Sequence, residues 1–316
     1  PSSTPSPIPT ATATPLPPFV PLTQDDAKRI LDTILSTSLP AVGATASTVT
    51  GDTITVTELS FVEEAVSLYE TGYFLLTGER PNSVPIILPR DEYLQLIDER
   101  FGGELRLKQA LAFCCDQGLT GLRLIINGSL PSPQVIGTLA HESGHARQRT
   151  TNLAQSGTTG ASNLGALREA EAYVFQAAII RQLGEYSGIN ATTFPFGYKL
   201  REWVDDYFTF VVQNIDELTL PHTRSFALPW MAVLHDPELS HLKLELTANG
   251  ILSPESLLAI YDRFVGLKLS EAESYVADLL VEFNSNRNSI RETILRRNGT
   301  VPEGFFTHNF SIFRYP

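Results

Sequence analysis

The chain has 316 residues, of which 42% are hydrophobic, and it carries a formal net charge of −12. This is enough apolar material for one large domain or two subdomains. The acidic balance argues against a nucleic-acid partner, because phosphate binding needs clustered Lys and Arg. No apolar run in the sequence reaches the roughly 18 residues that a membrane-spanning helix needs.

The N-terminal segment, residues 1–22, is uncharged and dominated by Pro, Ser and Thr. Such a composition cannot bury enough apolar surface to fold, so the segment is predicted to be a disordered, extended tether. The first residue is not Met, and tethers of this kind commonly join a secretion signal or lipid anchor to an extracellular domain. We therefore expect a secreted or cell-surface protein with an upstream signal or anchor, although a plain interdomain linker has the same composition.

Residues 23–128 alternate between helical and strand-like patterns. This alternation predicts a small mixed sheet with helices packed on it. We expect the last strand to form the edge of the sheet beside a cleft, where an extended peptide could pair with it. The predicted helices are 25–36, 60–69 and 92–101, and the predicted strands are 53–57, 73–76, 84–88 and 122–126.

The two cysteines, Cys114 and Cys115, are adjacent in the sequence. Consecutive Cα atoms are about 3.8 Å apart, which is shorter than the usual disulfide separation. The apolar spacing from Leu107 instead predicts a helix that stops at Gly118, with Cys114 packed on its apolar face. The sequence therefore offers no cysteine zinc site and no disulfide framework.

The segment His141-Glu142-Ser143-Gly144-His145 places two imidazoles one helical turn apart. Residues i and i+4 share a helix face, so both rings can reach one ion at about 2.0–2.1 Å. Glu142 lies roughly 100° around the helix, where it could accept a proton from a water bound to that ion. This H-E-x-x-H pattern is typical of a zinc site with Glu142 as general base.

The surroundings of this pattern support a helix. Ser132 and Pro133 fit an N-cap followed by proline at the first helical position, and the predicted strand 122–126 precedes them. The order of strand, loop and metal helix resembles the zinc-dependent peptidases of the zincin class, over residues 122–183. The resemblance implies a zincin-like α+β fold, a bound Zn²⁺ and hydrolysis of peptide bonds.

A third ligand is needed, because two imidazoles alone hold zinc weakly. The metzincin pattern would place Gly and His where this chain has Gln148 and Thr151, which excludes that branch. Gluzincins take a Glu from a second helix, and the predicted helix 166–186 offers two candidates. Glu171 lies on an apolar stripe where a buried carboxylate needs a partner, so we favour it; Glu169 lies on a wetter face and remains the alternative.

The C-terminal half is predicted to be mostly helical. A segment rich in proline and histidine, 220–241, is where the resemblance suggests a group that stabilises the oxyanion, and His222 is our candidate there. The predicted helices are 166–186, 198–215, 254–265 with Ser253 as N-cap, and 271–283 with Ser270 as N-cap.

These patterns together predict a sheet-plus-helix part at 23–150 and a helical part at 151–316, with the cleft between them. The predicted function is a zinc metallopeptidase acting on a peptide or protein substrate. In that hypothesis His141, His145 and Glu171 hold the zinc and Glu142 is the catalytic base. Two alternatives stay open: a surface-anchored binding module on a zincin scaffold, and a zinc hydrolase of a non-peptide amide or ester.

Overall fold

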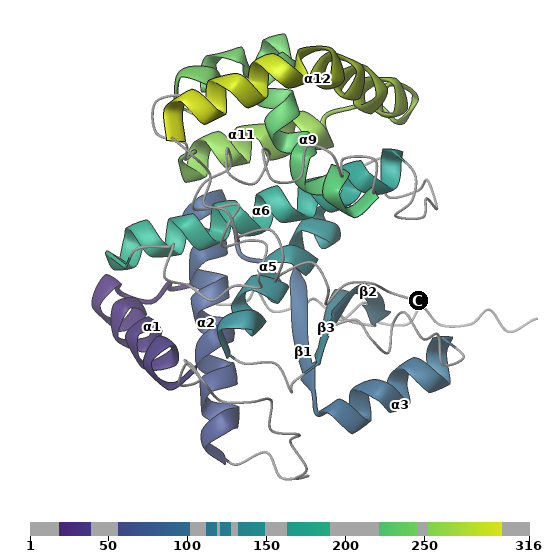
Figure 1. The fold of residues 1–316 in the computed structure, drawn as a ribbon. Coiled ribbons are helices and arrows are strands. Elements are labelled where there is room, and N and C mark those ends of the chain that lie inside the picture. Colours follow the sequence, from purple (N-terminus) through teal and green to yellow (C-terminus); the bar gives the residue numbers. More distant parts are fainter. Residues whose placement is uncertain are drawn as a thin grey trace, which may run out of the picture.

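In the described part of the chain, helices predominate and one small sheet is present, which confirms the coarse α+β expectation (Figure 1). The structure is a computed structural model. It describes residues 19–38, 56–101, 112–118, 121–127, 132–148, 163–189, 221–245 and 252–298.

The sheet has three strands in the order β1-β3-β2. Strand β1 (Ser83–Leu88) runs parallel to β3 (Gly121–Asn127), and β2 (Ala112–Gly118) runs antiparallel to β3. The prediction of 122–126 as the edge strand is therefore wrong, because β3 is central. Its buried residues Leu124, Ile125 and Ile126 are consecutive, which fits a strand covered on both faces.

Two predicted strands are not strands in the structure. Residues 73–76 lie in helix α2 (Val56–Thr77), as do 56 and 57 of the predicted strand 53–57, whose other residues lie outside the described part. Tyr69 and Tyr73 instead meet edge to face at the i, i+4 spacing of a helix, with ring centroids 6.2 Å apart. The helix ends at Thr77 and is followed by Gly78, whose φ of 70° suits glycine.

The predicted helix around Cys114 is also wrong, because residues 112–118 form strand β2. Only two residues separate β2 from β3, and Gly118 lies opposite Gly121 in the register. Pairing with β3 therefore overrides the helical spacing of the apolar residues. The remainder of that predicted helix lies outside the described residues.

The first described residues contact the domain. Phe19 stacks on Phe74 with ring centroids 5.3 Å apart. The backbone N–H of Leu22 donates to Thr71 Oγ1 at 3.1 Å, and its carbonyl accepts from the hydroxyl of Tyr186 at 2.9 Å. Residues 19–22, which we assigned to the tether, thus pack beside helix α1 (Gln24–Ser38).

Helix α6 (Asn163–Ser187) lies across the middle of the molecule (Figure 1). It contacts α1, α2 and α5 (Ser132–Gln148) on one side, and α9 (Pro221–His235), α11 (Pro254–Val265) and α12 (Leu269–Asn298) on the other. Most of its residues are buried. Helix α6 therefore packs against both the sheet-bearing part and the C-terminal helices.

Most of the other helix predictions are confirmed. Helix α3 (Arg90–Phe101) and α11 occur where expected, and Ser253 caps α11. Helix α12 begins at Leu269, so Ser270 lies inside it, and the predicted helix 198–215 lies outside the described residues. None of the described helices is long and apolar enough to cross a membrane.

Candidate metal centre

Helix α5 carries the H-E-x-x-H segment between the sheet and α6. It contacts all three strands as well as α2 and α6. One side of the helix is fully buried and apolar, which fixes its rotation about its own axis. The residues of that side are Val135, Ile136, Leu139 and Ala140.

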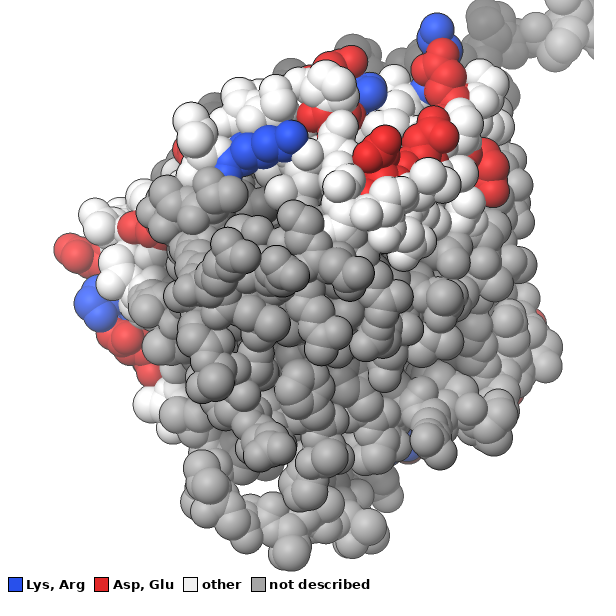
Figure 2. Space-filling model, turned by 45° about the horizontal axis from the view of Figure 1, so that its top comes forward, with Lys and Arg blue, Asp and Glu red and all other residues white. Residues whose placement is uncertain are grey.

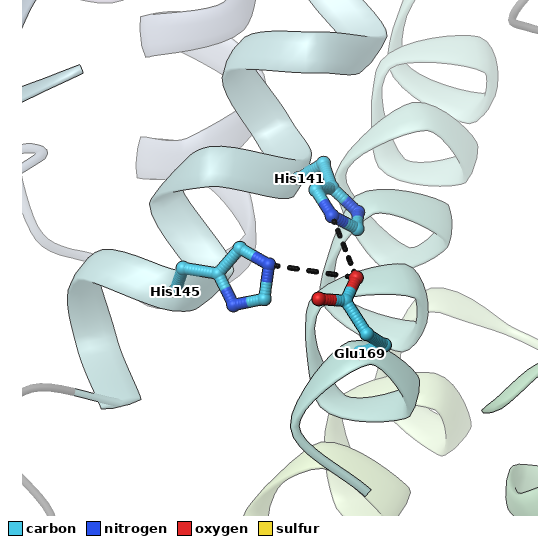
Figure 3. Close-up of side chains that lie close together, drawn as sticks. All are labelled: His141, His145 and Glu169. Carbon is cyan, nitrogen blue, oxygen red and sulfur yellow. Dashed lines mark ion pairs between the residues drawn. The ribbon is translucent and has the colours of Figure 1, made fainter. Parts of the chain in front are cut away.

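The two histidines point toward α6 and meet a carboxylate there (Figure 3). Glu169 Oε2 lies 3.5 Å from His141 Nε2 and 3.7 Å from His145 Nε2. The ligand atoms of these three residues all lie within 4.8 Å of one another. The histidine side chains are 15% and 16% exposed and that of Glu169 is 40% exposed, so solvent reaches the cluster from the carboxylate side.

These distances suit shared coordination better than direct hydrogen bonding. A hydrogen bond from an imidazole to a carboxylate is about 2.7–3.2 Å long, and both separations exceed that range. Two atoms that each lie about 2.0–2.1 Å from one tetrahedral ion are about 3.3–3.4 Å apart. The observed 3.5 and 3.7 Å are within a few tenths of an ångström of that value. The three residues could therefore hold one metal ion.

The structure brings Glu169 to the histidines, in the position that we assigned to Glu171. The prediction that Glu171 lies on a buried face of its helix is confirmed, since Glu171 is 0% exposed. Neither of its carboxyl oxygens has a hydrogen-bond partner among the described residues. Burial raises its pKa to about 8, against the opposing effects of His145 and Gln148. A metal ligand that substrate can reach must be partly exposed to solvent. On α6 this holds for the helix face of Glu169 and Tyr173, which are both partly buried.

His145 and Glu169 shift each other's pKa values. Burial alone would lower the pKa of His145, but the carboxylate of Glu169, with smaller effects of Glu142 and Gln148, raises it to about 9. Burial would likewise raise the pKa of Glu169, yet the two histidines hold it well below its usual value. The negative charge of Glu169 thus attracts positive charge to the point where the three ligand atoms converge.

Glu142 lies beside this cluster and is 8% exposed. Burial and then the charge of Glu142 raise the pKa of Tyr93 to about 12. Burial, followed by the charges of Glu169 and Glu142, also raises the pKa of Tyr173. The ring of Tyr173 packs on that of His141 with centroids 4.5 Å apart. The charge of Glu142, the carboxylate proposed as the base, therefore acts on both tyrosines.

Gly144 allows α5 and α6 to approach closely. A Cβ at this position would lie 2.8 Å from the Cα of Ala172, which is shorter than real contacts. Ala172 follows Glu169 by less than one helical turn. The glycine between Glu142 and His145 therefore sets the distance at which Glu169 meets the histidines.

The end of α5 is anchored by Arg147. Its guanidinium lies over the rings of Tyr73, Phe175 and Tyr261, at 5.9, 5.3 and 5.7 Å from their centroids. It also donates a hydrogen bond to the hydroxyl of Tyr73 at 2.9 Å. Cation–π contacts with three helices hold the last turn of α5 in place.

Two residues of the site were missed in the sequence. The amide oxygen of Gln148 accepts a hydrogen bond from His145 Nδ1 at 2.9 Å. Its position three residues after His145 on the same helix face was the available signal. Tyr173 follows Glu169 by four residues and so shares its face. The side chain of His222, our candidate for the oxyanion, lies outside the described residues.

Comparisons with protein families, with curated proteins and with solved structures found no match.

Proposed function

We propose that this domain is a zinc-dependent hydrolase of the zincin type that cleaves peptide bonds. The observation that carries the proposal is the convergence of His141, His145 and Glu169, whose ligand atoms lie within 4.8 Å of one another. Both histidine–carboxylate separations are close to the value for two ligands of one tetrahedral ion. Two imidazoles and one carboxylate are the ligand set of catalytic zinc sites that keep a fourth position for water. Glu142, on the same helix, supplies the acid–base group that such a site needs.

In this mechanism, bound zinc would lower the pKa of a coordinated water toward 7 and polarise the substrate carbonyl. Glu142 takes a proton from the attacking water and delivers it to the leaving nitrogen. Its low exposure keeps bulk water from competing for that proton. Tyr173, packed against His141, holds that imidazole in its orientation.

The substrate side of the proposal rests on the sheet edge and on charge. Strand β2 contacts α5, and its other edge has no strand partner within the described residues, so an extended peptide could pair there. Figure 2 shows acidic and basic side chains on the described part of one face, with no continuous basic patch there. The net charge of −12 suits a peptide better than a nucleic acid. With the composition of residues 1–22, we propose an extracytoplasmic location.

The test combines metal analysis with Glu142→Gln. We expect the purified wild type to retain about one zinc per chain and to hydrolyse unstructured protein substrates. Glu142→Gln should retain the zinc while hydrolysis falls by about 10² or more, because only proton transfer is lost. Glu282→Gln, on α12, is the matched control and should change neither quantity.

Absence of zinc from the wild type, with no uptake on titration, would reject the metal site. Retained zinc without hydrolysis of any amide or ester in a broad substrate panel would reject the enzyme and favour the binding module. Full activity in Glu142→Gln would remove that residue from the mechanism.

A further inference from the structure

Gln148 links the histidine of one helix to the ligand-bearing turn of the other. It is the last residue of α5 and is 0% exposed. Its amide oxygen lies 2.9 Å from His145 Nδ1, and its amide nitrogen donates to the backbone carbonyl of Arg168 at 2.6 Å. Arg168 immediately precedes Glu169 on α6.

The backbone partner fixes which way the amide faces. A carbonyl oxygen can only accept a hydrogen bond, so the group of Gln148 that faces Arg168 must be the NH₂. The oxygen of the amide then faces His145, and an oxygen can only accept. His145 must therefore carry a proton on Nδ1.

This protonation leaves the other nitrogen of His145 available for a metal. Nε2 is the atom that lies 3.7 Å from Glu169 Oε2, on the side where the three ligand atoms converge. Neutral His145 with its proton on Nδ1 directs the Nε2 lone pair to that point. His141 lacks such support, since its Nδ1 has no hydrogen-bond partner among the described residues.

We propose that Gln148 is the positioning residue of this metal site: one amide selects the Nδ1–H form of His145 and ties it to the α6 turn that bears Glu169. The inference rests on the proposed zinc site but concerns a residue that touches neither metal nor substrate. It predicts that the two ligands lose their alignment together when the amide is removed, because both bonds come from one side chain.

The test uses Gln148→Met, which keeps the length of the side chain and removes both bonds. Zinc affinity, measured by competition with a chelator, should fall about 10–100-fold, the usual effect of losing an outer partner of a ligand histidine. Gln176→Met is the matched control: Gln176 is 8% exposed, and its amide oxygen has no hydrogen-bond partner among the described residues. It should keep wild-type affinity.

A second measurement does not depend on the variant or on activity. In ¹⁵N-histidine spectra of the zinc-loaded wild type, His145 should show a slowly exchanging proton on Nδ1 and coordination through Nε2. Metal-free Gln148→Met should exchange its Nδ1 proton faster than the metal-free wild type does.

The outcomes separate this inference from the proposed function. A wild type that takes up no zinc rejects the metal site itself. A wild type that binds zinc with His145 protonated on Nε2 overturns the role of Gln148 even if Gln148→Met fails to fold. Equal zinc affinity in wild type, Gln148→Met and Gln176→Met overturns it as well, and leaves the metal site standing.

Discussion

At the scale of single residues, Glu169 and Glu171 are two carboxylates on one helix with opposite surroundings. Glu169 is 40% exposed and faces two imidazoles, whereas Glu171 is fully buried. We predict that Glu169→Gln lowers zinc affinity at least 10²-fold, because it removes the anionic ligand. Glu171→Gln should bind zinc within a few-fold of wild type, since a neutral amide of the same shape replaces a carboxyl whose pKa is about 8.

Both variants should be compared by chelator competition on samples of equal helical content. Loss of zinc in Glu171→Gln with retention in Glu169→Gln would restore the ligand set that the sequence favoured. The pair is well matched, because in each variant one carboxylate oxygen on the same helix is replaced by an amide nitrogen.

At the scale of elements, the crossing of α5 over α6 is set by Gly144. We predict that Gly144→Ala destabilises the fold by about 1–3 kcal/mol, the usual cost of overpacking. It should also weaken zinc binding, because the added Cβ pushes Ala172, and with it the turn of Glu169, away from the histidines. Denaturant unfolding and zinc competition measure the two effects.

Gly72→Ala is the control for crowding alone. Its Cβ would lie 2.6 Å from Leu183 Cγ, at the contact between α2 and the far end of α6. It should lower stability and leave zinc affinity unchanged. If both variants weaken zinc equally, the crossing at Gly144 has no special role in the site.

A second element-scale prediction concerns Asp236, where α9 gives way to the short helix η4 (Pro237–Leu242). Its carboxylate is 4% exposed and accepts from Arg263 Nε at 2.8 Å and from the Tyr275 hydroxyl at 2.9 Å. Burial alone would raise its pKa, but the Glu238 N–H, Arg263 and Tyr275 outweigh it and lower the pKa. The folded state therefore favours the ionised form.

The stability that Asp236 contributes depends on pH. A lowered pKa contributes stability that is present above the ordinary value of 3.8 and is lost as pH falls through the lower folded value. Asp236→Asn should cost about 2 kcal/mol at pH 7, with the difference from wild type shrinking below about pH 4. Glu238→Gln is the control: Glu238 is 68% exposed and 3.4 Å from the same arginine, and should cost under about 0.5 kcal/mol. A pH-independent cost would show that the charge of Asp236 is not what matters.

At the scale of the whole molecule, the start of the folded domain can be located by truncation. Deleting residues 1–18 should leave the thermal midpoint unchanged, because their composition offers no packing face. Deleting residues 1–22 removes the Phe19 stack on Phe74 and both backbone hydrogen bonds of Leu22. The midpoint should then fall by about 2–4 °C for each kcal/mol lost. Equal midpoints would place the boundary at residue 23, as the sequence suggested.

Local signals sufficed where a helix or strand depends on its own residues. Ser253 with Pro254 gave the start of α11, and the i, i+4 histidines gave the face of the site. The strand character of Cys114 could not be seen in the same way, because it depends on pairing with β3. The choice between Glu169 and Glu171 likewise depends on how α5 crosses α6, and that crossing is decided by contacts between residues distant in the sequence.

Glu169 lies in the second turn of α6, which begins at Asn163, and buried residues such as Ala166 and Leu167 also belong to this part of the helix. The first turn of a helix lacks internal acceptors for its N–H groups and opens more readily than the middle. The proposed ligand Glu169 is therefore closer to a helix end than to the middle of α6. If Glu169 binds the metal, we expect its release to begin with unwinding at this end, and hydrogen exchange of the amide protons of residues 163–170 should report it before any helix beyond the site opens.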